Sequence, residues 1–316
     1  MSSNPHVLAV ARLSALLLPQ LQAAFNLHDR LHETDAAAFA LVAPQVRAIA
    51  ASGESKVSAE LMARLPALEI ISVMGVGYDG IDVAAAKARG VVVTHTPKVL
   101  NDDVADLALG LMLCAARQLP AADRYVRSGQ WATSGAMPLA RKMSGARLGL
   151  VGMGRIGQAI AHRALAFGMS VAYTSRQPKD VPHRYLPSAV ALAAEVDFLV
   201  VITPGGAATR HLINAEVLAA LGTKGILVNV ARGSVVDEAA LIDALERGVI
   251  GGAGLDVFEN EPNVPERLRA LPQVVLAPHI GSATGQTRQA MADLACANLK
   301  AHFGGQPLPS PVPECR

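Results

Sequence analysis

The chain has 316 residues, of which 51% are hydrophobic and 17% charged, and its formal net charge is +2. This composition excludes a disordered chain, and the length suits two domains better than one core. The sequence has no basic block and its aromatic content is only 3%, so neither a phosphate-backbone footprint nor a base-stacking surface is present and we expect no nucleic-acid partner.

The N-terminal and cysteine patterns favour a cytoplasmic protein without a membrane partner. Residues 1–20 lack a basic segment followed by an uninterrupted apolar core, since Pro19 interrupts the most apolar part. Every apolar run is shorter than the roughly 18 residues of a membrane span. Cys114, Cys296 and Cys315 are an odd number without metal-ligand spacing, which predicts reduced thiols and no metal site.

The first third of the chain alternates between strand and helix patterns, which predicts a parallel sheet. Short apolar runs indicate strands at 7–11, 46–51, 70–74 and 91–96. Residues 101–119 then predict a long helix, opened by acidic residues that suit its N-terminus. Residues 120–142 are polar and interrupted, and we expect them to form an arm over a neighbouring subunit.

A second strand and helix alternation begins at residue 147. Six strands are expected, at 147–151, 171–175, 198–203, 225–231, 252–258 and 274–280. Six strands that start at a glycine-rich turn make a complete dinucleotide-binding domain. Residues 283–305 then predict a long helix that returns to the first domain.

The glycine-rich turn has the spacing of a dinucleotide-binding motif. Gly152, Gly154 and Gly157 follow the first of these strands and open a helix, within a unit of about thirty residues. The first glycine permits the tight turn, the second lets a pyrophosphate approach the backbone, and the third lets helix and strand pack closely. A glycine-rich connection of an ordinary α/β protein does not explain three glycines at these positions.

Arg176 stands where a carboxylate usually follows the second strand. An acid there accepts hydrogen bonds from the adenosine ribose 2′-OH, whereas an arginine accommodates a 2′-phosphate. With Ser175 before it and Lys179 after it, Arg176 predicts a preference for NADPH, with NADH as a second cofactor. The alternative is an ordinary exposed surface arginine.

Three ionisable residues follow later strands of the same domain. Arg232 and Glu261 come after the strands expected at 225–231 and 252–258, and His279 stands at the end of the strand expected at 274–280. Each alone is an ordinary surface, loop or capping residue. Together they supply a cation for an anionic substrate, a carboxylate and an acid–base histidine at the ligand-binding edge of a parallel sheet.

Six motifs occur together in one order along the chain: GVGYDGID (75–82), TPKVLNDDVADLALGLML (96–113), GLVGMGRIG (149–157), NVARGSVVDE (229–238), GAGLDVFENEP (252–262) and APHIGSAT (277–284). They resemble the D-2-hydroxyacid dehydrogenase family, and within it the glyoxylate/hydroxypyruvate reductase branch. The resemblance implies two doubly wound parallel-sheet α/β domains, Rossmann-like and flavodoxin-like, with a cleft between them. The substrate-binding domain would comprise residues 1–99 and 288–316, and the NAD(P)-binding Rossmann domain residues 100–287.

The resemblance also implies roles for the three ionisable residues. Arg232 would bind the carboxylate and keto oxygen of a 2-keto acid. His279 would donate a proton to the nascent alkoxide, and Glu261 would orient the imidazole and favour its charged form. Substrate contacts are expected from Arg232, His279, Ser52, Gly53, Val76 and Gly77. Cofactor contacts are expected from Gly152, Gly154, Arg155, Ile156, Gly157, Ser175, Arg176, Thr203, Pro204, Val230, Ala231 and Asp256.

Some properties differ among the relatives that the motifs suggest. Glu261 argues against formate oxidation, because the similar formate-oxidising enzymes have glutamine there. Residues 50–53 differ from the corresponding loop of plant aromatic-pyruvate reductases, which leaves the size of the substrate open. Trp131 matches the arm of a homodimer that reaches the partner's active site, or else is a local packing anchor. The alternative function is a nucleotide-sensing, corepressor-like binding protein on the same fold.

Overall fold

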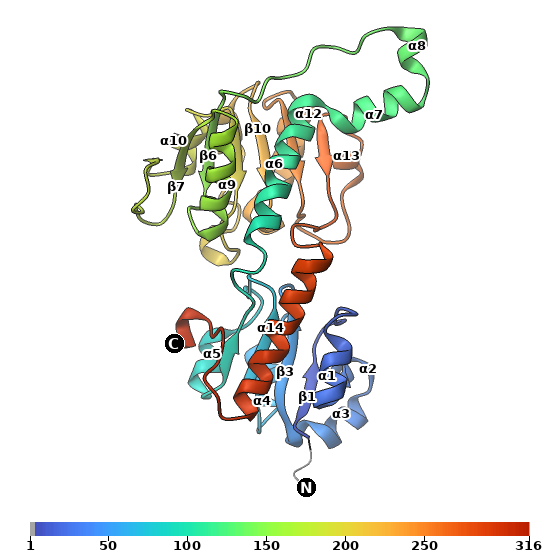
Figure 1. The fold of residues 1–316 in the computed structure, drawn as a ribbon, viewed down its shortest axis with the longest axis vertical. Coiled ribbons are helices and arrows are strands. Elements are labelled where there is room, and N and C mark those ends of the chain that lie inside the picture. Colours follow the sequence, from blue (N-terminus) through green and yellow to red (C-terminus); the bar gives the residue numbers. More distant parts are fainter. Residues whose placement is uncertain (1–3, 316) are drawn as a thin grey trace. The chain divides into compact units, whose positions relative to one another are not determined.

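The computed structural model describes residues 4–315 and divides into two compact units. The first unit runs up to Leu100 and resumes at Thr284, and the second is Asn101–Ala283. Each unit is a parallel β-sheet with helices packed on it (Figure 1).

The first unit contains a five-stranded sheet in the order β2-β1-β3-β4-β5, in which every pairing is parallel. This is the flavodoxin-like order 2-1-3-4-5. All residues of β4 are buried, as expected of a strand covered on both faces. The strands are β1 (His6–Ala9), β2 (Asn26–Asp29), β3 (Val46–Ser52), β4 (Ile70–Met74) and β5 (Val92–Thr94).

Several helices of the first unit begin at a side chain that caps them. Asp35, Ser58 and Asp82 each accept hydrogen bonds from backbone N–H groups of the following helical turn. The long C-terminal helix α14 packs on β4, where the Ser72 hydroxyl donates to the Ala295 carbonyl at 2.9 Å. The helices are α1 (Leu18–Ala24), α2 (Leu31–Thr34), α3 (Ala36–Val42), α4 (Ala59–Ala63), α5 (Val83–Ala88) and α14 (Gly285–Phe303), with short 3₁₀ turns at Ala43–Gln45 and Pro313–Cys315.

The second unit contains a seven-stranded parallel sheet in the order β12-β11-β10-β9-β6-β7-β8. Counted from β6, this is the Rossmann order 3-2-1-4-5-6 with one more strand at the edge, so the fold class expected from the sequence is confirmed. The strand order reverses between β6 and β9, where such sheets bind ligands. The strands are β6 (Arg147–Val151), β7 (Ser170–Thr174), β8 (Arg184–Tyr185), β9 (Phe198–Val201), β10 (Ile226–Asn229), β11 (Gly252–Leu255) and β12 (Val274–Leu276).

Most helices of the second unit bury apolar faces against this sheet. α9 lies over β6 and β7, α6 lies over β10 to β12, and α10, α11 and α12 pack in a row. Buried side chains of this row and of the strands form one hydrophobic cluster. The helices are α6 (Asn101–Arg117), α7 (Leu119–Arg127), α8 (Gln130–Ser134), α9 (Arg155–Ala166), α10 (Ala189–Ala193), α11 (Ala215–Leu221), α12 (Glu238–Glu246) and α13 (Glu266–Arg269), with 3₁₀ turns at Ala207–Thr209 and Gly233–Val235.

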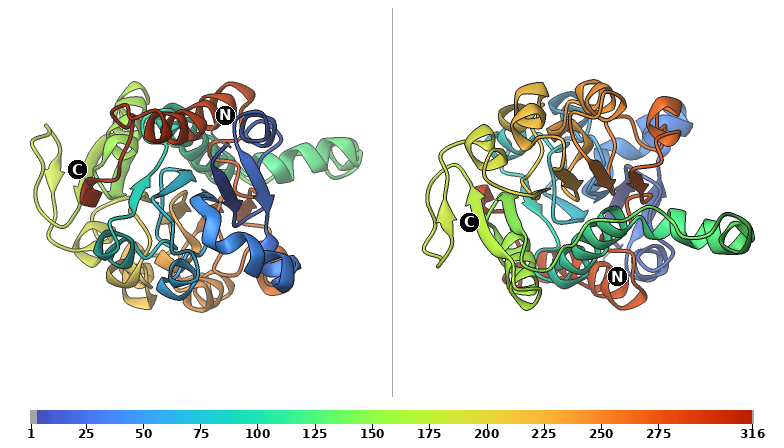
Figure 2. Two further views of the ribbon diagram at one scale, coloured as in Figure 1. Left: turned by 90° about the horizontal axis from the view of Figure 1, so that it is seen from below. Right: turned by 90° about the horizontal axis from the view of Figure 1, so that it is seen from above.

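The expected arm contains more helix than its polar sequence suggests. Residues 120–142 include most of α7 and all of α8 before an extended stretch. Both helices extend away from the sheet of their own unit (Figures 1 and 2). The large exposed apolar side chains of this arm are Val126, Trp131 and Leu139.

The sequence predicted four strands in the first unit and six in the second, so one strand of each sheet was missed. β2 reads NLHD, and β8 is only two residues long, so neither carries an apolar pattern. Several other expected strands were too long. β9 to β12 end two to four residues before the predicted ends, and those residues form loops that carry most of the candidate site.

Among residues 4–315, no single helix is long and apolar enough to cross a membrane. The bent pair α6 and α7 meets the length and composition criterion together, with a 60° angle between the two helices.

Candidate active site

The turn between β6 and α9 needs glycine at two positions and leaves space at the third. Gly152 has a φ of +115°, and a Cβ there would lie 2.5 Å from the Ile202 carbonyl oxygen. A Cβ on Gly157 would lie 2.4 Å from the Gly152 carbonyl oxygen, whereas a Cβ on Gly154 would meet nothing within 4 Å. The fold itself therefore requires Gly152 and Gly157, and the open space at Gly154 fits a cofactor pyrophosphate.

The first turn of α9 faces the same space. Gly154 is the N-cap residue and Arg155 and Ile156 open the helix, so backbone N–H groups at this end lack helical partners. No side chain among the described residues caps them. Such an end attracts anions through its N–H groups and its dipole, and these residues fit the cofactor that the sequence predicts.

The loop after β7 presents the residues expected at a 2′-phosphate. Arg176 and Lys179 are exposed, and Ser175 is half-buried. The Ser175 hydroxyl donates to the Gln177 carbonyl at 2.6 Å, so it would have to leave this bond to donate to a phosphate. Arg176 and Lys179 are the two cationic side chains of residues 175–180.

The other expected cofactor residues follow neighbouring strands that end in register. Val201 of β9 pairs with Asn229 of β10, and Asn229 pairs with Leu255 of β11. The residues that follow these three strand ends are Thr203 and Pro204, Val230 and Ala231, and Asp256. The structure thus brings them to the carboxyl edge of one sheet, beside the reversal of strand order.

Asn229 organises the backbone at this edge of the sheet, and the sequence did not identify it as a site residue. The side chain is 1% exposed; its amide nitrogen donates to the Arg232 carbonyl and its oxygen accepts the Ala231 N–H, both at 3.0 Å. These bonds hold the tight turn that presents Arg232. The pattern that could have indicated its role is an asparagine at the end of an otherwise apolar strand.

Asp256 is buried, with 2% exposure, and anchors the loop after β12. Its two carboxylate oxygens accept the N–H groups of Ile280 and Gly281 at 2.7 and 2.8 Å. Burial raises the pKa of Asp256, although these two hydrogen bonds oppose the rise. The His279 N–H also donates to the Asp256 carbonyl at 2.9 Å. Asp256 therefore fixes the backbone on both sides of the candidate acid–base residue.

His279 and Glu261 form a hydrogen-bonded pair. The distance from His279 Nδ1 to Glu261 Oε2 is 2.7 Å, and Glu261 Oε1 accepts the Phe258 N–H at 2.9 Å. Burial alone would raise the pKa of Glu261, but the bonds from His279 and Phe258 and the charges of His279 and Arg232 lower it below its usual value. The backbone of His279 has a φ of +53°, a strained conformation of the kind found at functional sites.

Arg232 belongs to the same group of side chains. It directly precedes the 3₁₀ turn Gly233–Val235, and its Nη1 donates to the Ala231 carbonyl at 2.7 Å. Its charge contributes to the lowered pKa of Glu261. The second unit therefore brings Arg232, Glu261 and His279 near one another, with a carboxylate on Nδ1 of the histidine.

The residues expected to bind substrate in the first unit lie in two touching loops. Ser52 ends β3 and Gly53 follows it, and a Cβ on Gly75 would lie 2.9 Å from the Gly53 Cα. Val76 and Gly77 continue the loop after β4. The Val76 carbonyl forms a 3.0 Å hydrogen bond with Nδ1 of the buried His95, and the Gly75 carbonyl accepts the Thr96 N–H at 2.8 Å.

Comparison with known proteins gives the family. The profile of the D-isomer specific 2-hydroxyacid dehydrogenase NAD-binding domain matches residues 109–281. The chain belongs to this family. The NAD(P)-dependent enzyme class expected from the sequence is thereby confirmed.

Known relatives align with this chain over most of its length. It is 50% identical to the hydroxyphenylpyruvate reductase of Plectranthus scutellarioides, over 86% of this chain and 87% of that one. It is 51% identical to glyoxylate/hydroxypyruvate reductase A of Arabidopsis thaliana, over 84% and 85% of the two chains. Among solved structures, it resembles the NADPH-dependent glyoxylate/hydroxypyruvate reductase of Sinorhizobium meliloti in complex with NADP and malonate, with a TM-score of 0.94 and 48% identity over 99% and 98% of the chains. These relatives support the reductase branch that the motifs indicate.

Proposed function

We propose that the enzyme is an NADPH-preferring 2-keto-acid reductase of the glyoxylate/hydroxypyruvate type. The observation that carries the proposal is the His279–Glu261 pair beside Arg232, within one sheet edge that also carries the glycine turn. The relatives reported above are reductases, and the S. meliloti enzyme is NADPH-dependent.

The side chains divide the reaction between them. A bound nicotinamide supplies hydride to C2 of the keto acid. Imidazolium His279 gives its proton to the oxygen on C2, and the carbonyl becomes a hydroxyl. Glu261 holds the ring through Nδ1, which leaves Nε2 as the proton donor. Arg232 binds the substrate carboxylate and stabilises the charge that develops on the keto oxygen.

The substrate and cofactor contacts are part of the same proposal. We assign the substrate carboxylate also to backbone N–H groups of Val76 and Gly77, with Ser52 and Gly53 lining the pocket. Asp256, which holds the loop of His279, is assigned to the nicotinamide end together with Val230 and Ala231. Arg176 and Lys179 favour NADPH over NADH through the 2′-phosphate.

Measurement of turnover tests the proposed reductase function. Oxidation of NADPH at 340 nm should occur with glyoxylate, hydroxypyruvate or a larger 2-keto acid, and a panel of these acids with both reduced cofactors would identify the preferred pair. His279→Ala should lower kcat by about two to four orders of magnitude, as loss of a general acid does. Binding of NADPH without turnover of any 2-keto acid would instead fit the corepressor-like alternative, which the relatives reported above do not support.

We also propose a cytoplasmic homodimer. All three cysteines lie within the described residues and are free, which fits a reducing compartment. Trp131 and Val126 are 64% and 57% exposed on the arm, and apolar side chains gathered on an extended element favour a subunit contact.

A further inference from the structure

A buried tyrosine closes the loop that carries Arg176. Tyr173 lies in β7 and is 1% exposed. Its hydroxyl accepts the Lys179 N–H at 2.7 Å and donates to the Lys179 carbonyl at 3.2 Å. One side-chain oxygen thus joins the strand to both backbone polar groups of a residue six positions later.

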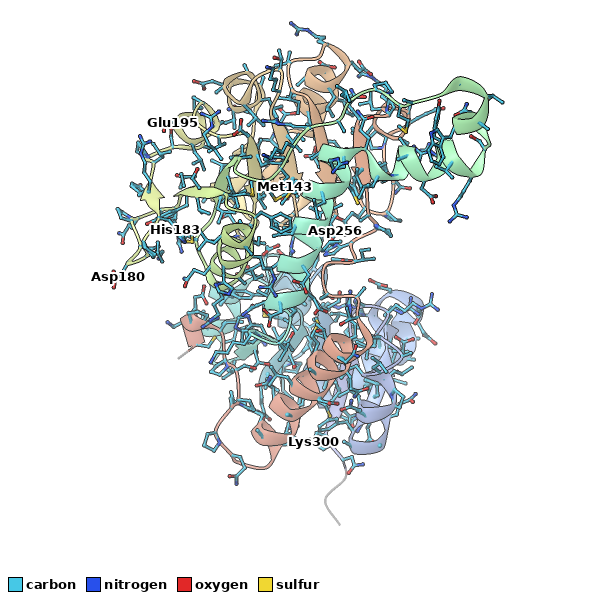
Figure 3. All side chains as sticks on the ribbon, turned by 45° about the horizontal axis from the view of Figure 1, so that its top comes forward. Met143, Asp180, His183, Glu195, Asp256 and Lys300 are labelled. Carbon is cyan, nitrogen blue, oxygen red and sulfur yellow. The ribbon has the colours of Figure 1, made fainter. Side chains whose placement is uncertain are left out.

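Arg176 stands in the middle of the segment that this contact closes. Residues 175–180 form no regular secondary structure, and Asp180 and His183 lie at the edge of the unit (Figure 3). A second hydroxyl acts inside the loop, where Ser175 donates to the Gln177 carbonyl at 2.6 Å. Tyr185 of β8 packs its ring edge against Tyr173 and reaches the Ser175 carbonyl only at 3.4 Å. The Tyr173 hydroxyl is therefore the main anchor at the far end of the loop.

The hydrogen bonds of the Tyr173 hydroxyl determine where two positive charges of the loop lie. Lys179 is the anchored residue itself, and Arg176 lies three residues before it, so one contact sets the backbone positions of two exposed cations. A phosphate binds most tightly to cations whose positions are already fixed, since ordering a loop on binding weakens affinity. An adenosine ribose without the phosphate makes no demand on these cations.

We propose that Tyr173 is a positioning residue for cofactor choice: its hydroxyl holds the 175–179 loop in the conformation that binds the 2′-phosphate of NADPH. This inference rests on the NADPH preference proposed above. It assigns to Tyr173 an effect on NADPH that is absent for NADH, which a purely structural tyrosine would not show.

The test is Tyr173→Phe, which removes one oxygen and keeps the ring. We expect the KM for NADPH to rise about three- to tenfold, the size of the effect of ordering one or a few side chains, while KM for NADH and kcat stay within twofold. Adenosine 2′,5′-bisphosphate should lose inhibition by the same factor, and 5′-AMP should not. Tyr185→Phe is the matched control, because it removes the neighbouring hydroxyl with the longer bond, and its kinetics should stay within twofold of the parent.

The variant Arg176→Ala distinguishes failure of the role proposed for Tyr173 from failure of the proposed 2′-phosphate site. If Arg176→Ala leaves the NADPH to NADH ratio unchanged, the proposed 2′-phosphate site is wrong. If Arg176→Ala lowers the ratio but Tyr173→Phe does not, the site stands and the role of Tyr173 is wrong. Equal increases of both KM values in Tyr173→Phe, or a fall in the thermal midpoint with an unchanged ratio, would show a structural residue and overturn the inference.

Discussion

Gly233 packs against the backbone of Phe258 so closely that no side chain fits between them. A Cβ on Gly233 would lie 1.9 Å from the Phe258 carbonyl carbon and 2.4 Å from the Glu259 nitrogen. Gly233 follows Arg232, and Phe258 donates its N–H to Glu261. The turn that presents the cation and the turn that presents the carboxylate therefore fix each other's positions.

Gly233→Ala should disrupt both turns at once. Overpacking a buried contact costs about 1–3 kcal/mol, so denaturant unfolding should show a loss in that range. Because Arg232 and Glu261 move apart, kcat/KM for the keto acid should fall at least about tenfold, as small misplacements at an active site do. Gly110→Ala in α6 is the control, since its Cβ meets nothing within 4 Å, and its stability and activity should be at least those of the parent. Parental activity in Gly233→Ala would show that the two turns are independent.

Gly154→Ala should separate folding from cofactor binding. The added Cβ meets no protein atom within 4 Å and the residue has a φ of −83°, so the thermal midpoint without cofactor should not change. The methyl group would enter the space assigned to the pyrophosphate, and KM for NADPH should rise about tenfold or more. Gly152→Ala, whose Cβ would clash with Ile202, should instead lower the midpoint. Normal NADPH kinetics in Gly154→Ala would move the pyrophosphate elsewhere.

The sequence revealed those features whose cause lies within a few neighbouring residues. The glycine spacing at 152–157 was readable because turn, helix start and close packing all follow from local backbone geometry. Arg232, Glu261 and His279 were readable because each follows a strand, and parallel strands end at one edge.

Contacts between residues that are distant in sequence could not be predicted in this way. Neither Gly233 against Phe258 nor the Tyr173 hydroxyl on Lys179 leaves a pattern in the sequence, since each depends on how two loops meet in space. β2 and β8 were missed because edge strands with few partners need no apolar periodicity.

Arg176→Asp should reverse the cofactor preference. The substitution removes a charge-assisted bond to the 2′-phosphate, worth about 1.5–3 kcal/mol, and adds repulsion, while the new carboxylate accepts hydrogen bonds from the ribose hydroxyls of NADH. The ratio of kcat/KM values for NADPH and NADH should fall by roughly a hundredfold. The measurement is initial rates with each cofactor at a saturating 2-keto acid. Arg210→Asp, on an exposed arginine paired with Glu259, is a control for the change of charge. Equal efficiency of the parent enzyme with both cofactors would already contradict the role of Arg176.

Val126→Glu should weaken the subunit contact proposed for the arm. Val126 is 57% exposed, so a glutamate there leaves the monomer fold intact, but it places a charge in any apolar interface that the arm forms. Light scattering coupled to gel filtration should show dimers of the parent and a shift toward monomers of the variant. Leu41→Glu in α3 of the first unit, at a leucine that is 77% exposed, should leave the mass unchanged. A monomeric parent enzyme would remove the dimer from the proposal.

Glu261→Gln should change how both stability and rate depend on pH. Because the pKa of Glu261 is lowered in the folded enzyme, its carboxylate contributes stability that is complete above the unfolded value of about 4.3 and is lost as pH falls through the folded value. The free energy of unfolding of the parent should thus exceed that of the variant at pH 7, with a difference that shrinks below about pH 4. In the rate profile, the alkaline limb of keto-acid reduction should move to lower pH, because imidazolium His279 loses its anionic partner. Glu259→Gln is the matched control: it removes a nearby carboxylate that bonds Arg210 and His211 instead, and it should leave the rate profile in place. A profile unchanged in Glu261→Gln would show that the carboxylate does not hold the proton donor in its charged form.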